Sequence, residues 1–232
     1  MSPTADVEFP SYLKAYFPSR LNVTKFTLGE HSHDLRFKVT LDPLPKNNPF
    51  ITLSEGPSDD GNTLAIVGNL KDYLGTWSSV IQVNDGATTM YNRCDDTYRL
   101  YHFSLKLHGS RREEFEWRPT EGNEVHEMFR HAKGFKLVRL KSVGPGARKG
   151  GKRKERQVDE TSDGKEVVAI WATEKSLIQG NLILGIKPFK FELRASGKSG
   201  DLGSEFGYFA LASALKIWAW KSLGISGFKF VG

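Results

Sequence analysis

The chain has 232 residues, of which 38% are hydrophobic and 12% aromatic, so it is long enough to bury a sizeable core without covalent staples. Cys94 is the only cysteine, which excludes an internal disulfide and any structural zinc site built from several cysteines. The formal net charge is +6, but residues 148–156 (RKGGKRKER) hold six basic side chains and one acidic one, so this segment supplies nearly all of the excess.

The N-terminal residues 1–16 contain Asp6, Glu8 and Pro10 and lack an apolar stretch of signal-peptide length. Together with the single cysteine, this favours a reducing compartment. We therefore expect an intracellular protein, cytoplasmic or nuclear, that reaches membranes only peripherally.

Apolar and polar residues alternate along much of the chain, as in residues 35–41, 101–108 and 114–118. A period of two is typical of strands with one face in a core. The pattern predicts about a dozen strands, at 25–28, 35–41, 50–54, 63–69, 79–84, 88–93, 98–107, 114–119, 135–143, 166–173, 181–186 and 190–193.

Turn signals separate these strands. Asn84-Asp85-Gly86 joins two short strands, and Asp163-Gly164 precedes the run from Val167 to Ala172. Odd-numbered and even-numbered positions of that run are both apolar, which predicts a strand covered on both faces. Residues 144–164 contain no bulky apolar side chain except Val158 and are interpreted as a long mobile loop. No segment has the composition of a linker, so we expect one domain spanning 1–232.

The C-terminal segment breaks the strand pattern. Alanine becomes frequent, and a helix is predicted at about 202–223, with Asp201 or Ser204 as its N-cap and Gly224 at the C′ position. The part from Phe206 to Trp220 is apolar in nearly every direction, so it belongs either in a core or in a membrane. It is too short to span a bilayer and includes Lys216, and we therefore expect a buried core helix.

About twelve strands followed by an apolar C-terminal helix resemble the tubby C-terminal-like superfamily, which includes the tubby domain, phospholipid scramblases and LURP-one-related proteins. The resemblance rests on the strand pattern from Lys25 to Leu193, including EFEWRP (114–119), FKLVRL (135–140) and EVVAIWA (166–172), and on the segment 202–223. It implies a mainly β fold, a closed antiparallel barrel of about twelve strands that encloses the helix. Tubby domains bind phosphoinositide headgroups, but no functional motif carries over to particular positions here.

Histidines are the first candidates for metal or catalytic chemistry. His31 and His33, with Asp34, could supply metal ligands, but a polar turn before the strand at Leu35 is the favoured interpretation. His126 and His131 are five residues apart, which points them in different directions on a helix. His102 and His108 lie about 20 Å apart along a strand.

Motifs for catalysis are lacking in the sequence. No G-x-S-x-G elbow occurs, and the partial Walker pattern from Gly146 to Lys152 has Arg153 where Ser or Thr would hold magnesium. We therefore expect a protein that is not an enzyme and has no cofactor or metal, and we rank an enzyme of unrecognised type last among the alternatives.

The basic segment is the strongest functional candidate, and its six cations are Arg148, Lys149, Lys152, Arg153, Lys154 and Arg156. Near an anionic membrane each basic group contributes about 1 kcal/mol, so the composition fits binding of phosphoinositides or another polyanion. It also fits a localisation signal in a nuclear or cytoplasmic regulatory protein that binds a protein partner, or a solvated loop that only aids solubility. Nucleic acid is disfavoured because no stacking aromatics are interleaved. Arg111 and Arg112 would add to the patch if the fold brings them close.

Overall fold

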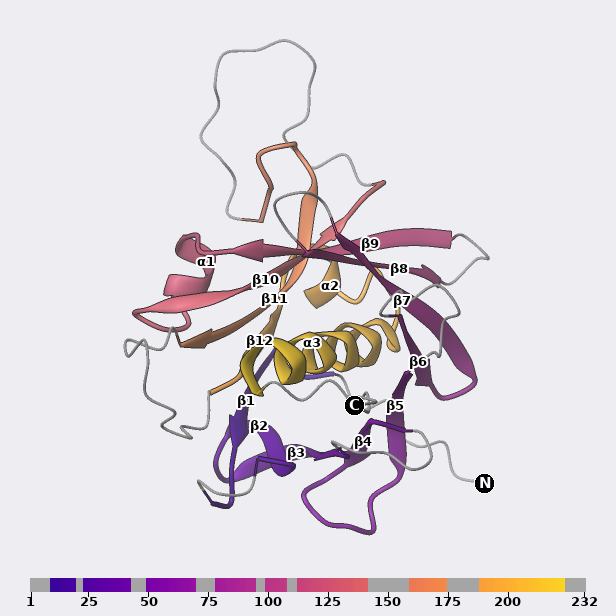
Figure 1. Cartoon of the computed structure of the whole chain (residues 1–232), viewed down its shortest axis with the longest axis vertical. Helices are drawn as coiled ribbons and strands as arrows, with labels where there is room; N and C mark the ends of the chain where they lie inside the picture. The colour runs from indigo at the N-terminus through magenta and orange to yellow at the C-terminus, as the bar shows by residue number, and fades with distance from the viewer. Residues whose placement is uncertain are drawn as a thin grey trace, which may run out of the picture.

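The computed structural model describes residues 9–19, 23–42, 49–69, 78–94, 99–107, 112–141, 159–174 and 188–223. Within these ranges the chain forms a closed barrel of twelve antiparallel strands around a long helix (Figure 1). The predicted fold class is confirmed.

Each strand pairs with its neighbours in the sequence, and β1 pairs with β12 to close the barrel. The strands are β1 (Tyr12–Tyr16), β2 (Lys25–His31), β3 (Asp34–Leu41), β4 (Ile51–Glu55), β5 (Thr63–Asn69), β6 (Ser79–Val83), β7 (Gly86–Cys94), β8 (Arg99–Lys106), β9 (Arg112–Thr120), β10 (Ala132–Arg139), β11 (Glu166–Glu174) and β12 (Lys190–Leu193).

Two predicted turns are confirmed. Val83 pairs with Gly86, so Asn84 and Asp85 form a two-residue hairpin turn in which Asn84 has a φ of 47°. This left-handed conformation is one that asparagine tolerates better than most residues. The second turn lies before β11, where the amide of Gly164 (φ 72°) donates to the carbonyl of Thr161.

The prediction missed β1, and one predicted strand, 181–186, lies outside the described residues. In β1 (YLKAY) apolar or aromatic residues stand at both parities, which obscures the alternation. Its Leu13 is fully buried and pairs with Phe191 of β12, a partner far along the chain. Of the predicted loop 144–164, residues 159–164 form the turn before β11, and the rest lies outside the described part.

Strand β11 is buried on both faces, as its apolar run predicted. Inside the barrel, Val168 and Trp171 belong to the main core. Outside, Val167 and Ile170 belong to a second cluster with residues of the short helix α1 (Asn123–His126). A second short helix, α2 (Ala195–Lys198), also packs on β11.

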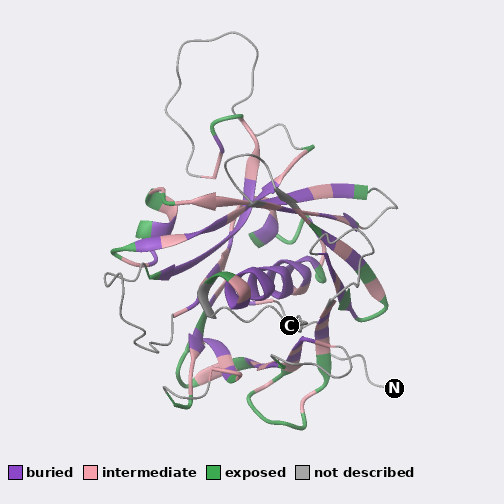
Figure 2. Cartoon of the chain, in the orientation of Figure 1, coloured by how far each residue is buried: buried purple, intermediate pink, exposed green. Residues whose placement is uncertain are grey.

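Helix α3 (Phe206–Leu223) lies inside the ring of strands and is buried almost all round (Figures 1 and 2). The predicted core helix from Phe206 to Trp220 is confirmed, but the expected start near 202 is wrong. Gly203 adopts a φ of 85°, which a right-handed helix does not contain, so residues 201–205 form turns and the helix begins at Phe206. Among the described helices, none combines the length and hydropathy needed to cross a bilayer.

A buried hydrogen bond anchors α3 to the barrel wall. The indole Nε1 of Trp117 on β9 donates to Ser213 Oγ at 2.8 Å, and that hydroxyl donates to the carbonyl of Ala210 at 2.8 Å. Both Trp117 and Ser213 are 0% exposed, so neither group has water as an alternative partner.

Replacing Ser213 with alanine should lower the free energy of unfolding by about 1–3 kcal/mol, because the indole N–H of Trp117 would stay buried without an acceptor. Urea denaturation measures this. The double variant Trp117→Phe/Ser213→Ala should lose less than the sum of the single losses, since it removes both partners. A Ser213→Ala variant as stable as the parent would show that the bond contributes nothing.

Candidate functional site

A cleft of about 960 Å³ opens in the barrel wall beside the C-terminal end of α3. Its lining comes from β8 to β11, from the turn before β11 and from Lys221 of α3. This volume lies in the range of sites for small organic ligands, about 300–1,000 Å³. Two other pockets among the described residues are smaller, at about 210 and 40 Å³.

The cleft lies where β9 parts from its neighbour β8, which itself begins two residues before Tyr101, at Arg99. Pairing between them ends at Tyr101 and Trp117, whereas β9 continues to Thr120 and pairs there with β10. Pro119 lies in this extension, and proline is tolerated at a sheet edge because it has no N–H to donate. The cleft therefore has lining residues from both faces of the β9–β10 pair.

Ion pairs fix the outer wall of the cleft. Arg118 Nε contacts Glu116 Oε1 at 2.7 Å, and Arg118 Nη1 donates to both oxygens of Asp163, at 3.0 and 2.9 Å. Burial opposes the charged form of Arg118, but the bonds to Glu116 and Asp163 outweigh it and raise the pKa of the guanidinium. Partial burial likewise opposes ionisation of Asp163, yet hydrogen bonds from Thr161 and Arg118 lower the pKa of its carboxyl. Arg118 and Asp163 are therefore charged at neutral pH, and their ion pair ties the turn before β11 to the barrel.

Lys136 extends this wall. Its Nζ lies 3.4 Å from Glu124 Oε1, and the Thr120 hydroxyl donates to the same oxygen at 2.6 Å. Burial by itself would raise the pKa of Glu124, but these contacts lower it. The Lys136 charge is thus already compensated.

Aromatic rings form the inner wall. Phe135 and Trp171 are register partners on β10 and β11 whose rings stack at 5.2 Å between centroids. The series continues to Phe189, at 6.1 Å from Trp171, and to Tyr101, at 5.8 Å from Phe135. These rings are buried and surround the C-terminal half of α3, so this wall is rigid and apolar.

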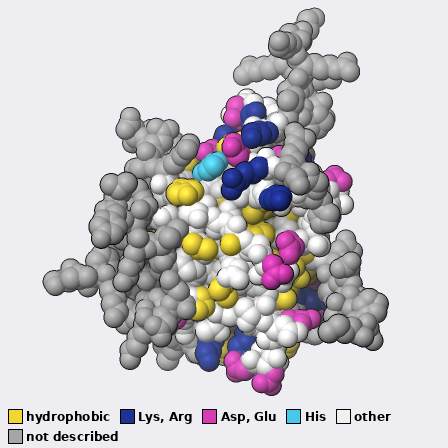
Figure 3. Space-filling view, turned by 90° about the vertical axis from the view of Figure 1, so that its right-hand side faces the viewer, with side chains coloured by type: hydrophobic (Ala, Val, Ile, Leu, Met, Phe, Trp, Pro, Cys, Tyr) yellow, Lys and Arg dark blue, Asp and Glu magenta, His cyan; other side chains and the backbone are white. Residues whose placement is uncertain are grey.

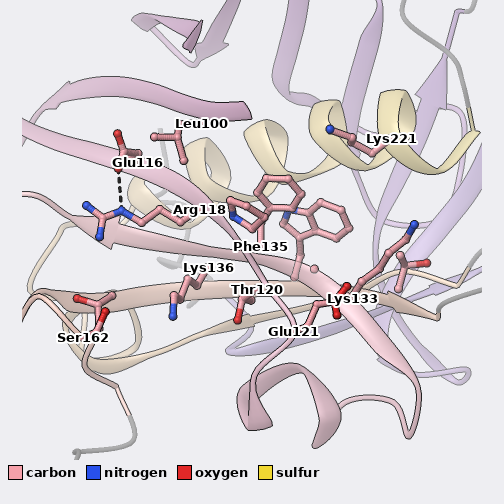
Figure 4. Close-up of a pocket in the computed structure, with 15 residues that line it drawn as sticks. Leu100, Glu116, Arg118, Thr120, Glu121, Lys133, Phe135, Lys136, Ser162 and Lys221 are labelled. Atoms are coloured by element: carbon pink, nitrogen blue, oxygen red, sulfur yellow. Dashed lines mark hydrogen bonds and ion pairs between the residues drawn. The ribbon is translucent and has the colours of Figure 1, made fainter. Parts of the chain in front are cut away.

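Three polar groups of the inner wall lack partners. Trp171 Nε1 and Thr173 Oγ1 are shielded from solvent and make no hydrogen bond. Lys133, the register partner of Thr173, makes no ion pair or hydrogen bond within the described part of the chain. Figure 4 shows Glu116, Arg118 and Lys136 toward one end of the cleft, Glu121, Lys133 and Lys221 toward the other, and Phe135 between them.

The cleft is lined by four basic side chains (Arg118, Lys133, Lys136 and Lys221) and two acidic ones (Glu116 and Glu121), and the adjacent carboxylates Asp163 and Glu124 compensate Arg118 and Lys136. Other parts of the surface are mixed. On the face shown in Figure 3, the Lys and Arg side chains that are drawn lie beside Asp and Glu side chains. This face is therefore mixed in charge.

All six residues of the predicted basic site, Arg148, Lys149, Lys152, Arg153, Lys154 and Arg156, lie outside the described residues, as does Arg111. The described chain resumes at Asp159, shortly after this segment. Thr161 and Ser162 then line the cleft, and Asp163 binds Arg118. In the sequence, the predicted basic segment ends three residues before the described chain resumes.

His31, His33 and Asp34 lie at a polar turn, as the favoured interpretation predicted. His31 and His33 flank the β2–β3 turn with their rings stacked at 5.4 Å, and Asp34 pairs with Arg36 at 2.8 Å. His126 Nδ1 lies 3.2 Å from the carbonyl of Arg130. Within the described ranges, no three His, Cys, Asp or Glu side chains gather as a metal site would require.

The sequence prediction missed the cleft residues Lys133, Trp171 and Thr173. One signal was present on β10, where Lys133 shares the parity of Phe135 and Leu137, two buried residues whose register partners lie in the core. A charge in an inward-facing row is unusual and marks a barrel end or a binding position. Neither the pairing of Lys133 with Thr173 nor the gap beside β8 can be seen from local pattern.

Comparisons of the chain with protein-family models, with curated proteins and with solved structures give no match.

Proposed function

We propose that the chain is a noncatalytic binding module of the tubby-like type that engages anionic ligands, foremost phosphoinositide headgroups, through its basic segment. The observation that carries the proposal is the concentration of charge, since residues 148–156 hold six cations and one anion in a chain of net charge +6. Six cations on one short segment attract a polyanion with little demand on geometry, and near an anionic surface each adds about 1 kcal/mol.

The described structure supports this proposal in two ways. A closed barrel around a C-terminal helix is the architecture that the resemblance implied. The turn that follows the basic segment lines the same cleft as Lys133, whose charge no carboxylate of the described residues compensates, so an anion attracted by the segment would find a further cation there.

Co-sedimentation with vesicles tests the proposal. The chain should pellet with phosphatidylcholine vesicles that carry phosphatidylinositol bisphosphate and stay in solution with pure phosphatidylcholine vesicles. Changing all six cations of residues 148–156 to glutamine should reduce binding at least tenfold, because several additive electrostatic terms disappear together.

A charge-matched control shows whether binding depends on the cations of residues 148–156 or on the net charge of the whole chain. Six scattered, exposed cations are changed to glutamine instead: Lys14, Lys25, Arg36, Lys106, Arg130 and Lys198. This control should retain most of the binding. Equal binding to both kinds of vesicle, or equal loss in the two variants, would contradict the proposal.

A localisation signal is the second candidate function for the same segment, favoured by its density of Lys and Arg. A fluorescent fusion of the full chain should then be nuclear and should become diffuse when 148–156 is deleted. An unchanged distribution would rule this role out.

A further inference from the structure

We propose that the cleft holds one molecule of an anionic amphiphile, with its apolar body against Phe135 and Trp171 and its anionic head at Lys133. The inference rests on the proposed function, because it names the ligand class and the position for the same binding module. Carboxylate and phosphate heads share the required chemistry, and they come either from a free amphiphile or from a lipid in a bilayer.

The inward-facing row of β10 gives the first argument. This row is Lys133, Phe135, Leu137 and Arg139, with a cation at each end. Arg139 is satisfied by Glu113, through two hydrogen bonds of 3.1 Å, and by Glu166 at 3.5 Å. Lys133 has no such carboxylate in the described part of the chain, although the position is only partly exposed. A bound anion would give Lys133 the partner that Arg139 has within the protein.

The unpaired polar atoms beside Lys133 give the second argument. Thr173 is 0% exposed and Trp171 is 1% exposed, so water does not satisfy Thr173 Oγ1 or Trp171 Nε1. An unsatisfied buried group costs about 1–3 kcal/mol. An indole N–H is only a donor, and together with the ammonium of Lys133 it calls for an acceptor of negative charge. An anionic head that accepts from these groups would remove this cost.

The apolar rings give the third argument. A purely polar anion would gain nothing from the stacked rings of Phe135 and Trp171, which line the cleft next to these donors. An apolar body that packs against these rings gains about 25 cal/mol for each Å² of its own apolar surface that leaves water. The combination of rings, donors and a cation selects a molecule with one anionic head and an apolar body.

The indole resonances of a ¹⁵N-labelled sample report on the inference directly. Titration with dodecanoate, below its micelle concentration, should shift the Trp171 indole N–H downfield as it gains an acceptor, with assignment by Trp171→Phe. The Trp117 indole is an internal control, because it already donates to Ser213 and lies elsewhere in the core. Dodecanol, which lacks the charge, and acetate, which lacks the apolar body, should bind at least tenfold more weakly.

Two variants complete the test. Lys133→Gln should weaken dodecanoate binding about tenfold, the equivalent of about 1.4 kcal/mol. Lys198→Gln, on the exposed helix α2 outside the cleft, should bind like the parent. A Trp171 indole that stays unmoved at saturation, equal binding of dodecanol, or parental affinity in Lys133→Gln would each overturn the inference.

The two proposals fail in different ways. Vesicle binding without any dodecanoate shift, and with no Trp171 shift on the vesicles, would overturn the cleft assignment and leave the basic segment as the binding site. A dodecanoate shift without vesicle binding would support the cleft, identify a free amphiphile as the source, and overturn phosphoinositide binding. A Trp171 shift with phosphoinositide vesicles would support the cleft with a bilayer lipid as the source.

Discussion

Replacing Lys216 with methionine should raise the free energy of unfolding at pH 6 by about 2–4 kcal/mol. Lys216 is 6% exposed on the core helix, and its Nζ lies 4.1 Å from the centre of the Phe50 ring. Burial lowers the pKa of this amine to about 7, because the charged form loses its hydration. Methionine keeps the length of the side chain and a good helix propensity while removing the charge.

The same lowered pKa predicts how stability depends on pH. In the unfolded chain the amine titrates near 10.5, so between about 7 and 10.5 the unfolded state binds more protons than the folded state. Stability should therefore rise with pH across this interval, by at most about 1.4 kcal/mol per pH unit from this group. Below pH 7 both states are protonated and the full cost of burying the charge remains.

Urea denaturation at pH 6, 7.5 and 9 checks both expectations. The parent should become more stable toward pH 9, whereas Lys216→Met should show a much smaller slope. Lys198→Met, at an exposed position on α2, should keep the parental slope. A Lys216→Met variant that is less stable than the parent at pH 6 would show that the ammonium makes contacts that the core requires.

Changing Ala210 or Ala214 to aspartate should unfold the chain. Both alanines are 0% exposed in α3, which lies against β5 and β6 inside the barrel. A carboxylate there must be buried without a partner or be protonated, and the extra atoms strain a close-packed interior, at a combined cost of about 4 kcal/mol or more. That cost approaches the lower end of the stability of a typical domain, about 5–15 kcal/mol, and is enough to unfold a marginally stable one.

Circular dichroism and thermal melting measure this loss. Ser204→Asp is the matched control, since it adds the same group at an exposed position two residues before α3 begins, and it should melt like the parent. A soluble Ala210→Asp or Ala214→Asp variant with a cooperative melt near the parental temperature would contradict the burial of α3.

Local patterns were enough to predict the elements of this fold. The alternation in residues such as Leu35 to Leu41 identified strands because a pleated strand turns successive side chains to opposite faces. The apolar run from Phe206 to Trp220 identified a core helix because a helix that is apolar all round has no face for water. Lys216 entered that argument only as a charge unsuited to a membrane, and its burial inside the barrel could not be foreseen.

What the sequence determined by itself is the strands β2 to β12, two tight turns, the core helix and the concentration of positive charge in residues 148–156. What only the tertiary structure decided is β1, the cleft and its partnerless groups. Lys133, Trp171 and Thr173 meet because the register of β10 against β11, and the point where β8 and β9 stop pairing, are set by pairing along the whole barrel. Register is a long-range property, and a shift of one residue would exchange the inner and outer faces of a strand, so local spacing does not specify which side chains meet.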